Sequence, residues 1–373
     1  MRVAARPPTR RSAGVRTARR FPTSREALMH RTTIAGLLLS CGAASFWACT
    51  DKSPPTAQAP FPPATPGVRM DVAAPSCEPK THPSGLLVDK VTTPPSFGMA
   101  VRDDGLAYFT EFQSGGVGIT STQTRTVDGF IATGSVPTGV DFSPDGNTAY
   151  VTNQFSQNVS VIDVASAQVV ATIPTPGGEN PSVVRVSPDG TRLFIATAST
   201  TVYIVDTQTR QVIGSVQVGF VPNAFAVHPD GRIIYISSAF GGSVTEVDMF
   251  TGAALRTFTV GGIPQDMAVS HDGQRLYVAN ESAAVLDEIN LQSGQVTGTI
   301  ALAGGPFGIG VTPDDNQAYI SLPGPGLVQV FNLQSHKLSF TFDVGGRPRR
   351  IGFSQRGHIG AVANEAGFVT FVR

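Results

Sequence analysis

Val136 to Thr175 read VPTGVDFSPDGNTAYVTNQFSQNVSVIDVASAQVVATIPT. Within this stretch, four short runs alternate apolar and polar side chains, and three turn signals separate them. Alternation with a period of two is typical of strands that bury one face. The stretch therefore predicts four consecutive antiparallel β-strands.

Variants of this unit recur until the chain ends. The turn between its first two runs is built on Asp-Gly, and its second residue returns every 41 to 44 residues through seven copies. A proline stands nine residues before that position in six copies, and Pro95 is one residue early in the first. A repeated structural unit explains a phase kept this long. The seven turns are Asp104-Gly105, Asp145-Gly146, Asp189-Gly190, Asp230-Gly231, Asp272-Gly273, Asp314-Asp315 and Arg356-Gly357.

The residues of these turns have local reasons. Pro144 presets φ for a turn, Asp145 bonds nearby backbone, and Gly146 supplies the left-handed residue that closes the hairpin. Asp315 takes the glycine position in the sixth copy. It tolerates that conformation at a cost of about 1 kcal/mol.

Two further positions recur inside the unit, and we assign both to structure. An aromatic in the second strand is expected to pack between layers, and a carboxylate or amide ending the third strand is expected to organise the next turn. The second-strand residues are Tyr108, Tyr150, Phe194, Tyr235, Tyr277 and Tyr319, with Ala361 in the last copy, and the third-strand residues are Asp163, Asp206, Asp248, Asn290 and Asn332.

Four strands every 40 to 45 residues is the period of propeller blades. The last copy ends after its third strand, and the run Gly85 to Thr92 supplies the missing fourth, with Asp89 as a misfit. Residues 84–373 are therefore predicted to form an all-β, seven-bladed β-propeller with four antiparallel strands per blade. Its ring is closed by an N-terminal strand that completes the last blade.

The residues Tyr150-Val151-Thr152-Asn153, after the Ser-Pro-Asp-Gly turn and before Val159 to Asp163, resemble the YVTN-type β-propeller repeats of surface-layer and periplasmic proteins. Tyr277 to Asn280 nearly copy them. The resemblance spans roughly residues 85–373. It implies an extracytoplasmic binding or scaffold protein and no active site. More distant relatives by architecture include lactonases, a streptogramin lyase and the haem d1 domain of nitrite reductase, and fold alone does not choose among them.

The N-terminal residues predict export. Residues 1–28 are an Arg-rich leader or a mis-called start, and residues 29–49 are a signal that ends in a lipobox-like sequence. We expect lipidation at Cys49, with Cys41 as the alternative. A disordered, Pro-rich tether follows at residues 50–83. These features predict an extracytoplasmic lipoprotein at the periplasm or cell surface, which meets the membrane only through its lipid.

Charge and cysteine content exclude several classes. Residues 1–31 hold nine of the 27 basic residues and one of the 27 acidic ones, so the chain from Thr50 onward carries a net charge of −8. That balance argues against nucleic-acid binding. No cysteine follows Cys77, which excludes a disulfide framework or a CxxCH haem attachment in the propeller. No metal or cofactor motif is present, so none is expected.

The family places propeller ligands over the central channel, on the face built by the loops that enter the first strands and the loops between second and third strands. There, Arg347, Arg349 and Arg350 form the densest charge cluster of the body. They either capture an anionic group or pair with neighbouring acids. The predicted ligand-binding residues are Asp266, Arg347, Arg349, Arg350, Phe155, Phe240 and Glu365, of which the phenylalanines are either binding anchors or plugs between blades.

Asp141 and Arg185 occupy the same first-strand position in adjacent copies, and we interpret them as a structural ion pair between blades. No set of titratable groups predicts catalysis. The sequence therefore favours a monomeric, lipid-anchored, non-catalytic propeller that binds an unknown protein or small molecule at its channel face. The alternative is a periplasmic lactonase- or lyase-like enzyme that uses Asp266 or Glu179 with the arginine cluster.

Overall fold

The structure is a computed structural model, and it describes residues 88–353 and 359–373. The predicted leader, export signal, lipidation sites at Cys49 and Cys41, and Pro-rich tether lie outside the described residues. In the described part of the chain, no helix has the length and apolarity that a membrane span requires.

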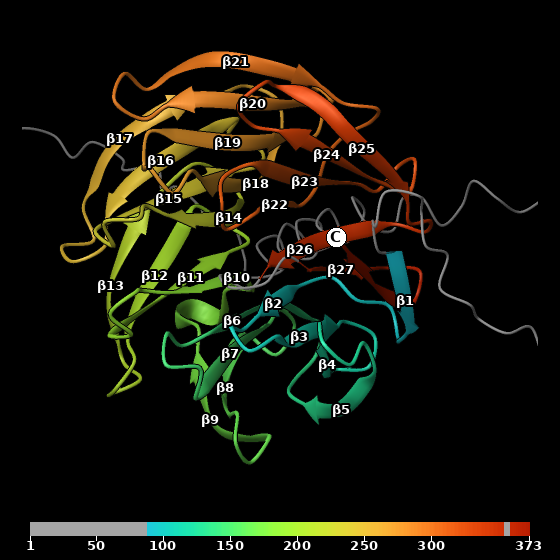
Figure 1. Ribbon diagram of the computed structural model, residues 1–373. Helices are drawn as coiled ribbons and strands as arrows, with labels where there is room; N and C mark the ends of the chain where they lie inside the picture. The colour runs from blue at the N-terminus through green and yellow to red at the C-terminus, as the bar shows by residue number, and fades with distance from the viewer. Residues whose placement is uncertain (1–87, 354–358) are drawn as a thin grey trace, which may run out of the picture. The chain divides into compact units, whose positions relative to one another are not determined.

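Seven antiparallel sheets of four strands each stand around a common centre (Figure 1). This arrangement confirms the predicted all-β, seven-bladed β-propeller. Blades are numbered in chain order, and each runs from an innermost first strand to an outermost fourth strand. Blade 1 comprises β2 (Met99–Val101), β3 (Leu106–Glu111), β4 (Gly116–Ser121) and β5 (Val127–Ala132), and blade 2 comprises β6 (Pro137–Phe142), β7 (Thr148–Asn153), β8 (Asn158–Asp163) and β9 (Gln168–Pro174).

The remaining blades follow the same plan, with one short 3-10 helix, η1 (Pro176–Gly178), before blade 3. Blade 3 comprises β10 (Pro181–Val186), β11 (Arg192–Thr197), β12 (Thr201–Asp206) and β13 (Val212–Gln217), and blade 4 comprises β14 (Pro222–Val227), β15 (Ile233–Ser238), β16 (Ser243–Asp248) and β17 (Ala254–Thr259). Blade 5 comprises β18 (Pro264–Val269), β19 (Arg275–Asn280), β20 (Val285–Asn290) and β21 (Gln295–Ala301), and blade 6 comprises β22 (Ile309–Val311), β23 (Gln317–Leu322), β24 (Leu327–Asn332) and β25 (Lys337–Asp343).

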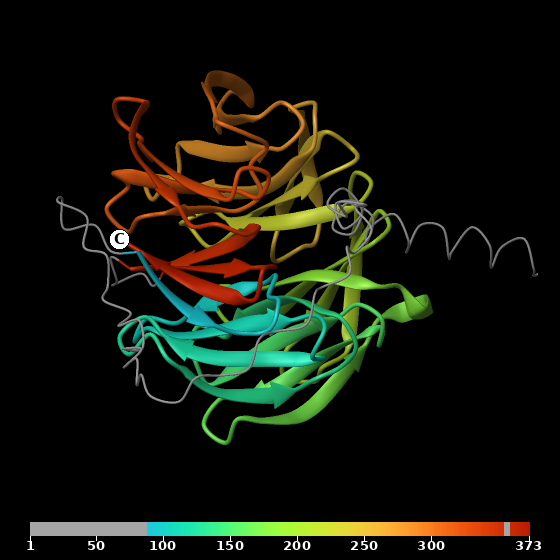
Figure 2. The ribbon, with the colours of Figure 1, turned by 90° about the vertical axis from the view of Figure 1, so that its right-hand side faces the viewer.

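Blade 7 joins the two ends of the described chain. Its order is β1 (Val88–Thr92), β28 (Phe368–Val372), β27 (Gly360–Asn364) and β26 (Pro348–Phe353), and Figure 2 shows β1 beside the C-terminal strands. The register pairs Lys90 with Thr370. The predicted closure is therefore present. Asp89, the expected misfit, faces Arg125 of blade 1 at 3.6 Å, so an ion pair accounts for it.

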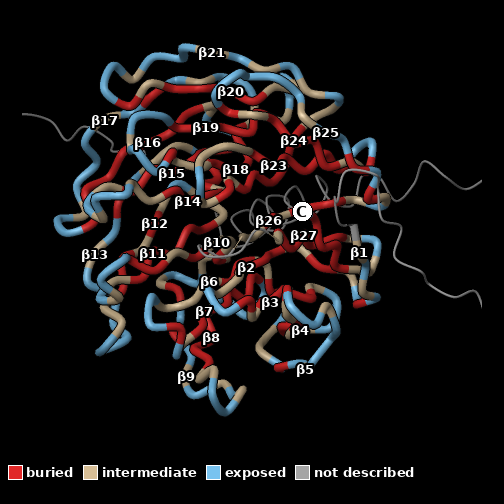
Figure 3. Tube along the Cα trace, viewed as in Figure 1, coloured by how far each residue is buried: buried red, intermediate tan, exposed pale blue. Residues whose placement is uncertain are grey.

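The core is divided among the interfaces between blades. Seven hydrophobic clusters lie in the described residues, and each combines residues of two neighbouring blades, including one between blades 7 and 1. The recurring aromatic is at most 5 % exposed in every copy that has it. This confirms the expected packing role. Figure 3 shows the buried residues in the inner strands, whereas outer strands such as β13 and β21 are mostly exposed.

Polar residues at the end of the second strand hold the start of their own blade. Most first strands contain a bulge just after their proline, as in β6 between Pro137 and Gly139. The Thr152 hydroxyl accepts a hydrogen bond from the Gly139 N–H at 2.8 Å, which satisfies a donor that the bulge removes from the ladder. Asn280 accepts from the Ile263 N–H at 3.0 Å and donates to the Gly261 carbonyl. These side chains therefore serve the blade.

The turns follow their predicted chemistry. Asp163 accepts hydrogen bonds from the Ser166 N–H and hydroxyl, which confirms a turn-organising role. Asp315 adopts φ 54°, as expected for a residue at a glycine position. The antiparallel order places all loops that enter first strands at one end of the channel, the entry-loop face. The described hairpins between first and second strands lie at the other end, the hairpin face.

Candidate functional site

At the entry-loop face, Arg350 reaches across the channel. Its Nη1 lies 2.6 Å from Asp266 Oδ1, and its Nη2 donates to the Asn223 carbonyl. Arg350 belongs to blade 7, whereas Asp266 and Asn223 belong to blades 5 and 4. The Arg350 and Asp266 side chains are only 12 % and 11 % exposed. The two residues therefore form a short, buried ion pair that spans this end of the channel.

The other two arginines of the cluster share one carboxylate. Glu365 accepts Arg349 Nε at 2.6 Å on Oε1, and its Oε2 lies 3.1 Å from Arg347 Nε. The Arg349 guanidinium also stands over the rings of Phe97 and Phe307, at 5.3 and 4.4 Å from their centroids. The structure thus brings the predicted acids and arginines together, with each guanidinium neutralised by a neighbour.

The remaining predicted residues lie apart from this network. Phe155 and Phe240 are 43 % and 42 % exposed, and no ring contact in the described residues joins either to the arginines. Phe240 instead lies near Phe220, with ring centroids 6.4 Å apart. Glu179 accepts hydrogen bonds from Thr197 and Ser199. The assignment of these residues to ligand binding stays a prediction.

Replacing Arg350 by Met should destabilise the propeller by about 3–5 kcal/mol, because the Asp266 carboxylate would then be buried without its partner. The double variant Arg350→Met/Asp266→Leu should recover much of the loss. Chemical denaturation of the two single variants and the double variant measures both effects. A cost below about 1 kcal/mol for Arg350→Met would mean that solvent, and not Arg350, balances the carboxylate.

The hairpin face holds a cavity of about 920 Å³. First strands of blades 7, 1, 2, 3 and 4 line it, together with the hairpins of blades 1, 2 and 3. Its innermost walls include Met99, Val140, Ile351 and Gly352. The channel is therefore barred at the entry-loop face and has a large cavity at the hairpin face, the reverse of where the family resemblance leads us to expect a ligand.

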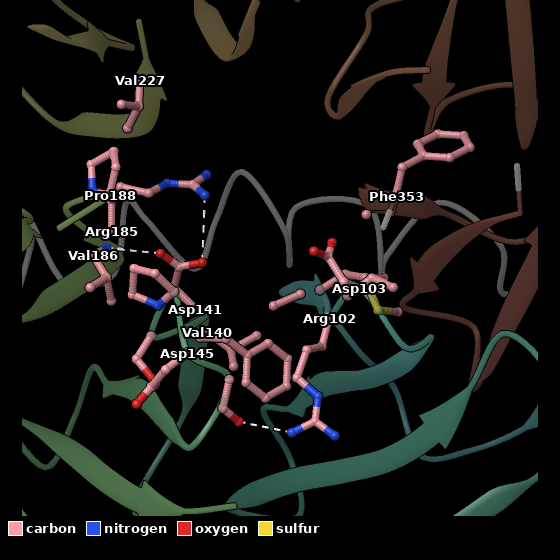
Figure 4. A pocket seen from close by; sticks show the side chains of 18 of the residues that line it. Arg102, Asp103, Val140, Asp141, Asp145, Arg185, Val186, Pro188, Val227 and Phe353 are labelled. Carbon is pink, nitrogen blue, oxygen red and sulfur yellow. Dashed lines mark hydrogen bonds and ion pairs between the residues drawn. The ribbon is translucent and has the colours of Figure 1, made fainter. Parts of the chain in front are cut away.

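Asp141 and Arg185 project from β6 and β10 at this cavity (Figure 4). The Val186 N–H donates to Asp141 Oδ2 at 2.8 Å, whereas Arg185 Nη1 is 3.5 Å from Oδ1. Arg185 Nη2 reaches the Phe225 carbonyl at 3.4 Å, and its Nε–H has no hydrogen-bond partner among the described residues. The side chain of Arg185 is 41 % exposed. The unpartnered Nε is buried from solvent, so only the exposed part of the guanidinium can meet a ligand.

The pair of Asp141 and Arg185 differs from the pair of Asp266 and Arg350 in burial and in geometry. Burial raises the pKa of Asp141, and the attraction of the loosely placed Arg185 offsets this only in part. A carboxyl with a raised pKa beside a cavity is typical of acid–base sites. The shorter and more buried pair of Asp266 and Arg350 has the features of a structural bar. The geometry therefore favours Asp141 and Arg185 as the chemically active pair.

The interpretation of Asp141 and Arg185 as an ion pair between blades is correct in its placement but too narrow. These residues stand opposite the second-strand aromatic, a position that is alanine or glycine in every other blade. The small residues of the other five blades leave space at this position, and the only two charged residues among the seven lie side by side. That contrast between copies was the available signal. The seven residues are Ala100, Asp141, Arg185, Ala226, Ala268, Gly310 and Gly352.

The fold and site together define a seven-bladed β-propeller with an acid–arginine pair in a channel cavity. The family model described as lactonase, 7-bladed beta-propeller, matches residues 119–254, which include Asp141 and Arg185. A solved structure titled Kuenenia stuttgartiensis Hydrazine Synthase is similar at 19 % identity, covering 75 % of this chain and 96 % of that chain with a TM-score of 0.70. At that identity the likeness concerns the fold alone. The search of curated proteins finds no match.

The family match corrects the main functional expectation. The sequence favours a non-catalytic scaffold at the cell envelope, because no set of titratable groups in it predicts catalysis. The match to a lactonase family overturns this, and supports the alternative of a lactonase- or lyase-like propeller better. The sequence reasoning missed that burial raises the pKa of the Asp141 carboxyl beside the Arg185 guanidinium, because burial depends on three-dimensional packing.

The described residues contain no group of three or more His, Cys, Asp or Glu side chains that could hold a metal ion.

Proposed function

We propose that this propeller is a lactonase-like hydrolase whose site is the hairpin-face cavity. The observation that carries the proposal is the pairing of Asp141, whose pKa burial raises, with a half-exposed Arg185 at a cavity of about 920 Å³. Both residues lie inside the stretch that resembles lactonases. A cavity of this size accommodates a small lactone and the water that attacks it.

In this mechanism, ionised Asp141 takes a proton from a water molecule while the water oxygen attacks the lactone carbonyl carbon. The carbonyl oxygen becomes an oxyanion, and the positive charge of the partly exposed Arg185 guanidinium stabilises it. When the carbonyl re-forms, the ring C–O bond breaks. The leaving alkoxide takes the proton back from Asp141, so the product is a hydroxy acid and Asp141 is again ionised.

We also propose that the repeats are of the YVTN type. The support is that the Thr and Asn of this motif have distinct bonding tasks, since Thr152 serves the bulge and Asn153 accepts from the Thr133 hydroxyl at 2.9 Å. Motif and site are separate in this proposal. The motif builds the blade, and the charged first-strand positions carry the chemistry.

The full chain should release acid from five- or six-membered lactones in a weakly buffered indicator assay. The rate should be proportional to protein concentration and saturate with substrate. A lactam of the same ring size should inhibit competitively, because it occupies the cavity and resists hydrolysis. Absence of acid release from every lactone of the panel, at protein concentrations that bind the lactam, would exclude the hydrolase.

A further inference from the structure

At the hairpin face, a proline of one hairpin packs beside the glycine of the next. Between blades 2 and 3, for example, Pro144 lies beside Gly190. The interface between blades 5 and 6 departs from this pattern at both positions. Blade 5 has His271 in place of the proline, and blade 6 has Asp315 in place of the glycine. The two departures from the repeat therefore lie at one interface.

These two residues form a two-point contact between the blades. Proline has no N–H, whereas the His271 N–H donates to Asp315 Oδ2 at 2.6 Å. The Nδ1 atom of the His271 ring lies 2.6 Å from Asp315 Oδ1. Asp315 keeps the left-handed conformation of the glycine position, with φ 54°. Both oxygens of one carboxylate are therefore bound by the preceding blade, one of them by a titratable imidazole.

A second histidine crosses the same interface at the outer strands. In blade 4, Glu246 pairs with Arg256 of the fourth strand at 2.7 Å. Blade 5 has Glu288 at the equivalent place, but Gly298 stands opposite it. His336, from the turn between β24 and β25 of blade 6, places its Nε2 3.0 Å from Glu288 Oε2. That oxygen is buried and makes no hydrogen bond among the described residues. The contact is therefore electrostatic, and it depends on the charge of the imidazole.

Both contacts become stronger when the imidazole is protonated. A neutral imidazole offers at most a hydrogen bond, whereas a protonated one adds the attraction of a full charge to a carboxylate. Among the described residues, these two contacts are the only ion pairs between blades 5 and 6. The hydrophobic cluster that the two blades share remains at every pH in this range. Protonation therefore changes the strength of the interface without being needed to form it.

We propose that the interface between blades 5 and 6 is pH-sensitive, and that it is stabilised as the pH falls through the range in which histidine is protonated. A contact between a cation and a carboxylate that exists only in the folded chain contributes below the range in which an imidazole ordinarily titrates, near about pH 6.5. That contribution is lost as the pH rises through this range. None of the four residues lines the hairpin-face cavity, so the proposal is independent of the hydrolase function.

Other charges near the two histidines moderate the response. Arg275 lies 3.3 Å from Glu288 Oε1 and repels a protonated His336. Asp315 is bound by His271 at both oxygens, so His271 is expected to contribute the larger part. The remaining titratable groups around His336 are Tyr277 and Lys337, and those around His271 are Asp272, Asp314, His228 and Asp230.

Hydrogen exchange of the full chain, followed by mass spectrometry, measures this interface, with each rate referred to the intrinsic exchange rate at that pH. Peptides that contain His271 or the turn between β24 and β25 should be roughly two- to five-fold better protected at pH 5.5 than at pH 8, as expected of exposed ion pairs. At pH 5.5 and about 1 M salt, this gain should fall to about half or less. Peptides of β7 and β8 in blade 2 should show no such difference.

Matched variants assign the response to its residues. His271→Asn keeps the backbone N–H and an amide donor but takes up no proton, so the pH difference in its hairpin should disappear. His336→Gln should remove the difference in the turn between β24 and β25. His228→Gln changes a histidine of blade 4 that contacts the Gly273 carbonyl, and it should leave both differences in place.

The proposal is overturned by a pH response that survives in the double variant His271→Asn/His336→Gln. Better protection of the wild type at pH 8 than at pH 5.5 would also overturn it. If a variant fails to fold, the salt series on the wild type decides, because a difference that 1 M salt leaves unchanged does not come from ion pairs.

Discussion

Asp141→Asn should lower kcat/KM for lactone hydrolysis by about 10²–10⁴-fold, the usual contribution of a general base. The amide keeps the size of the side chain and an oxygen that can accept from the Val186 N–H, but it cannot take a proton from water. Arg185, already 41 % exposed, remains solvated without its partner. The variant should therefore fold normally, with a change in unfolding free energy within about 1 kcal/mol.

The pH dependence of the wild type gives the same residue a second readout. Because burial raises the pKa of Asp141, kcat/KM should rise with pH through a value above the ordinary carboxyl pKa, and this limb should vanish in Asp141→Asn. The raised pKa also means that the ionised form is disfavoured by folding, so the amide costs no pH-linked stability at neutral pH. Asp128→Asn, an exposed change on an outer strand, should retain both rate and profile. A wild-type profile in Asp141→Asn would remove Asp141 from the mechanism.

The sequence predicted the fold because each repeat contains the residues that determine its own turns and strands. Every copy contains the turn and the proline, and six of the seven contain the aromatic. Seven copies in phase leave little choice of architecture. Details that depend on three-dimensional neighbours could not be predicted from the sequence. The first strands β2 and β22 begin later than the others, at Met99 and Ile309, and nothing in the repeat pattern marks this difference.

The candidate site was less accessible to sequence reasoning. The three arginines of the cluster stand out in the sequence. The structure shows that their guanidinium groups form ion pairs with Glu365 and Asp266. Asp141 and Arg185 attracted a structural interpretation because spacing alone makes them neighbours. What distinguishes them is the cavity beside them and the exposure of the Arg185 guanidinium, and both depend on side chains packed from five blades.

Deleting residues 88–92 from the full chain should lower Tm by about 10 °C and promote aggregation. Strand β1 pairs with β28 along five residues, from Val88↔Val372 to Thr92↔Phe368. At about 1 kcal/mol per net ladder hydrogen bond, its loss costs on the order of 4 kcal/mol. Val91 also leaves the cluster between blades 7 and 1. Differential scanning calorimetry and light scattering measure the two effects.

A five-residue deletion within residues 52–83 is the matched control, because it shortens the chain equally and keeps β1. The contrast tests how the ring is held. Blade 7 takes its fourth strand from the other end of the chain, so β1 fixes β28, and β28 in turn carries the fully buried Phe371 that packs against blade 1. An unchanged Tm and a monomeric profile after deletion would place the closing free energy in the inner strands, with Arg350 and Asp266 as the next contacts to remove. A loss confined to the deletion of β1 would instead show that the cavity, which blades 7 and 1 help to line, depends on a strand at its outer edge.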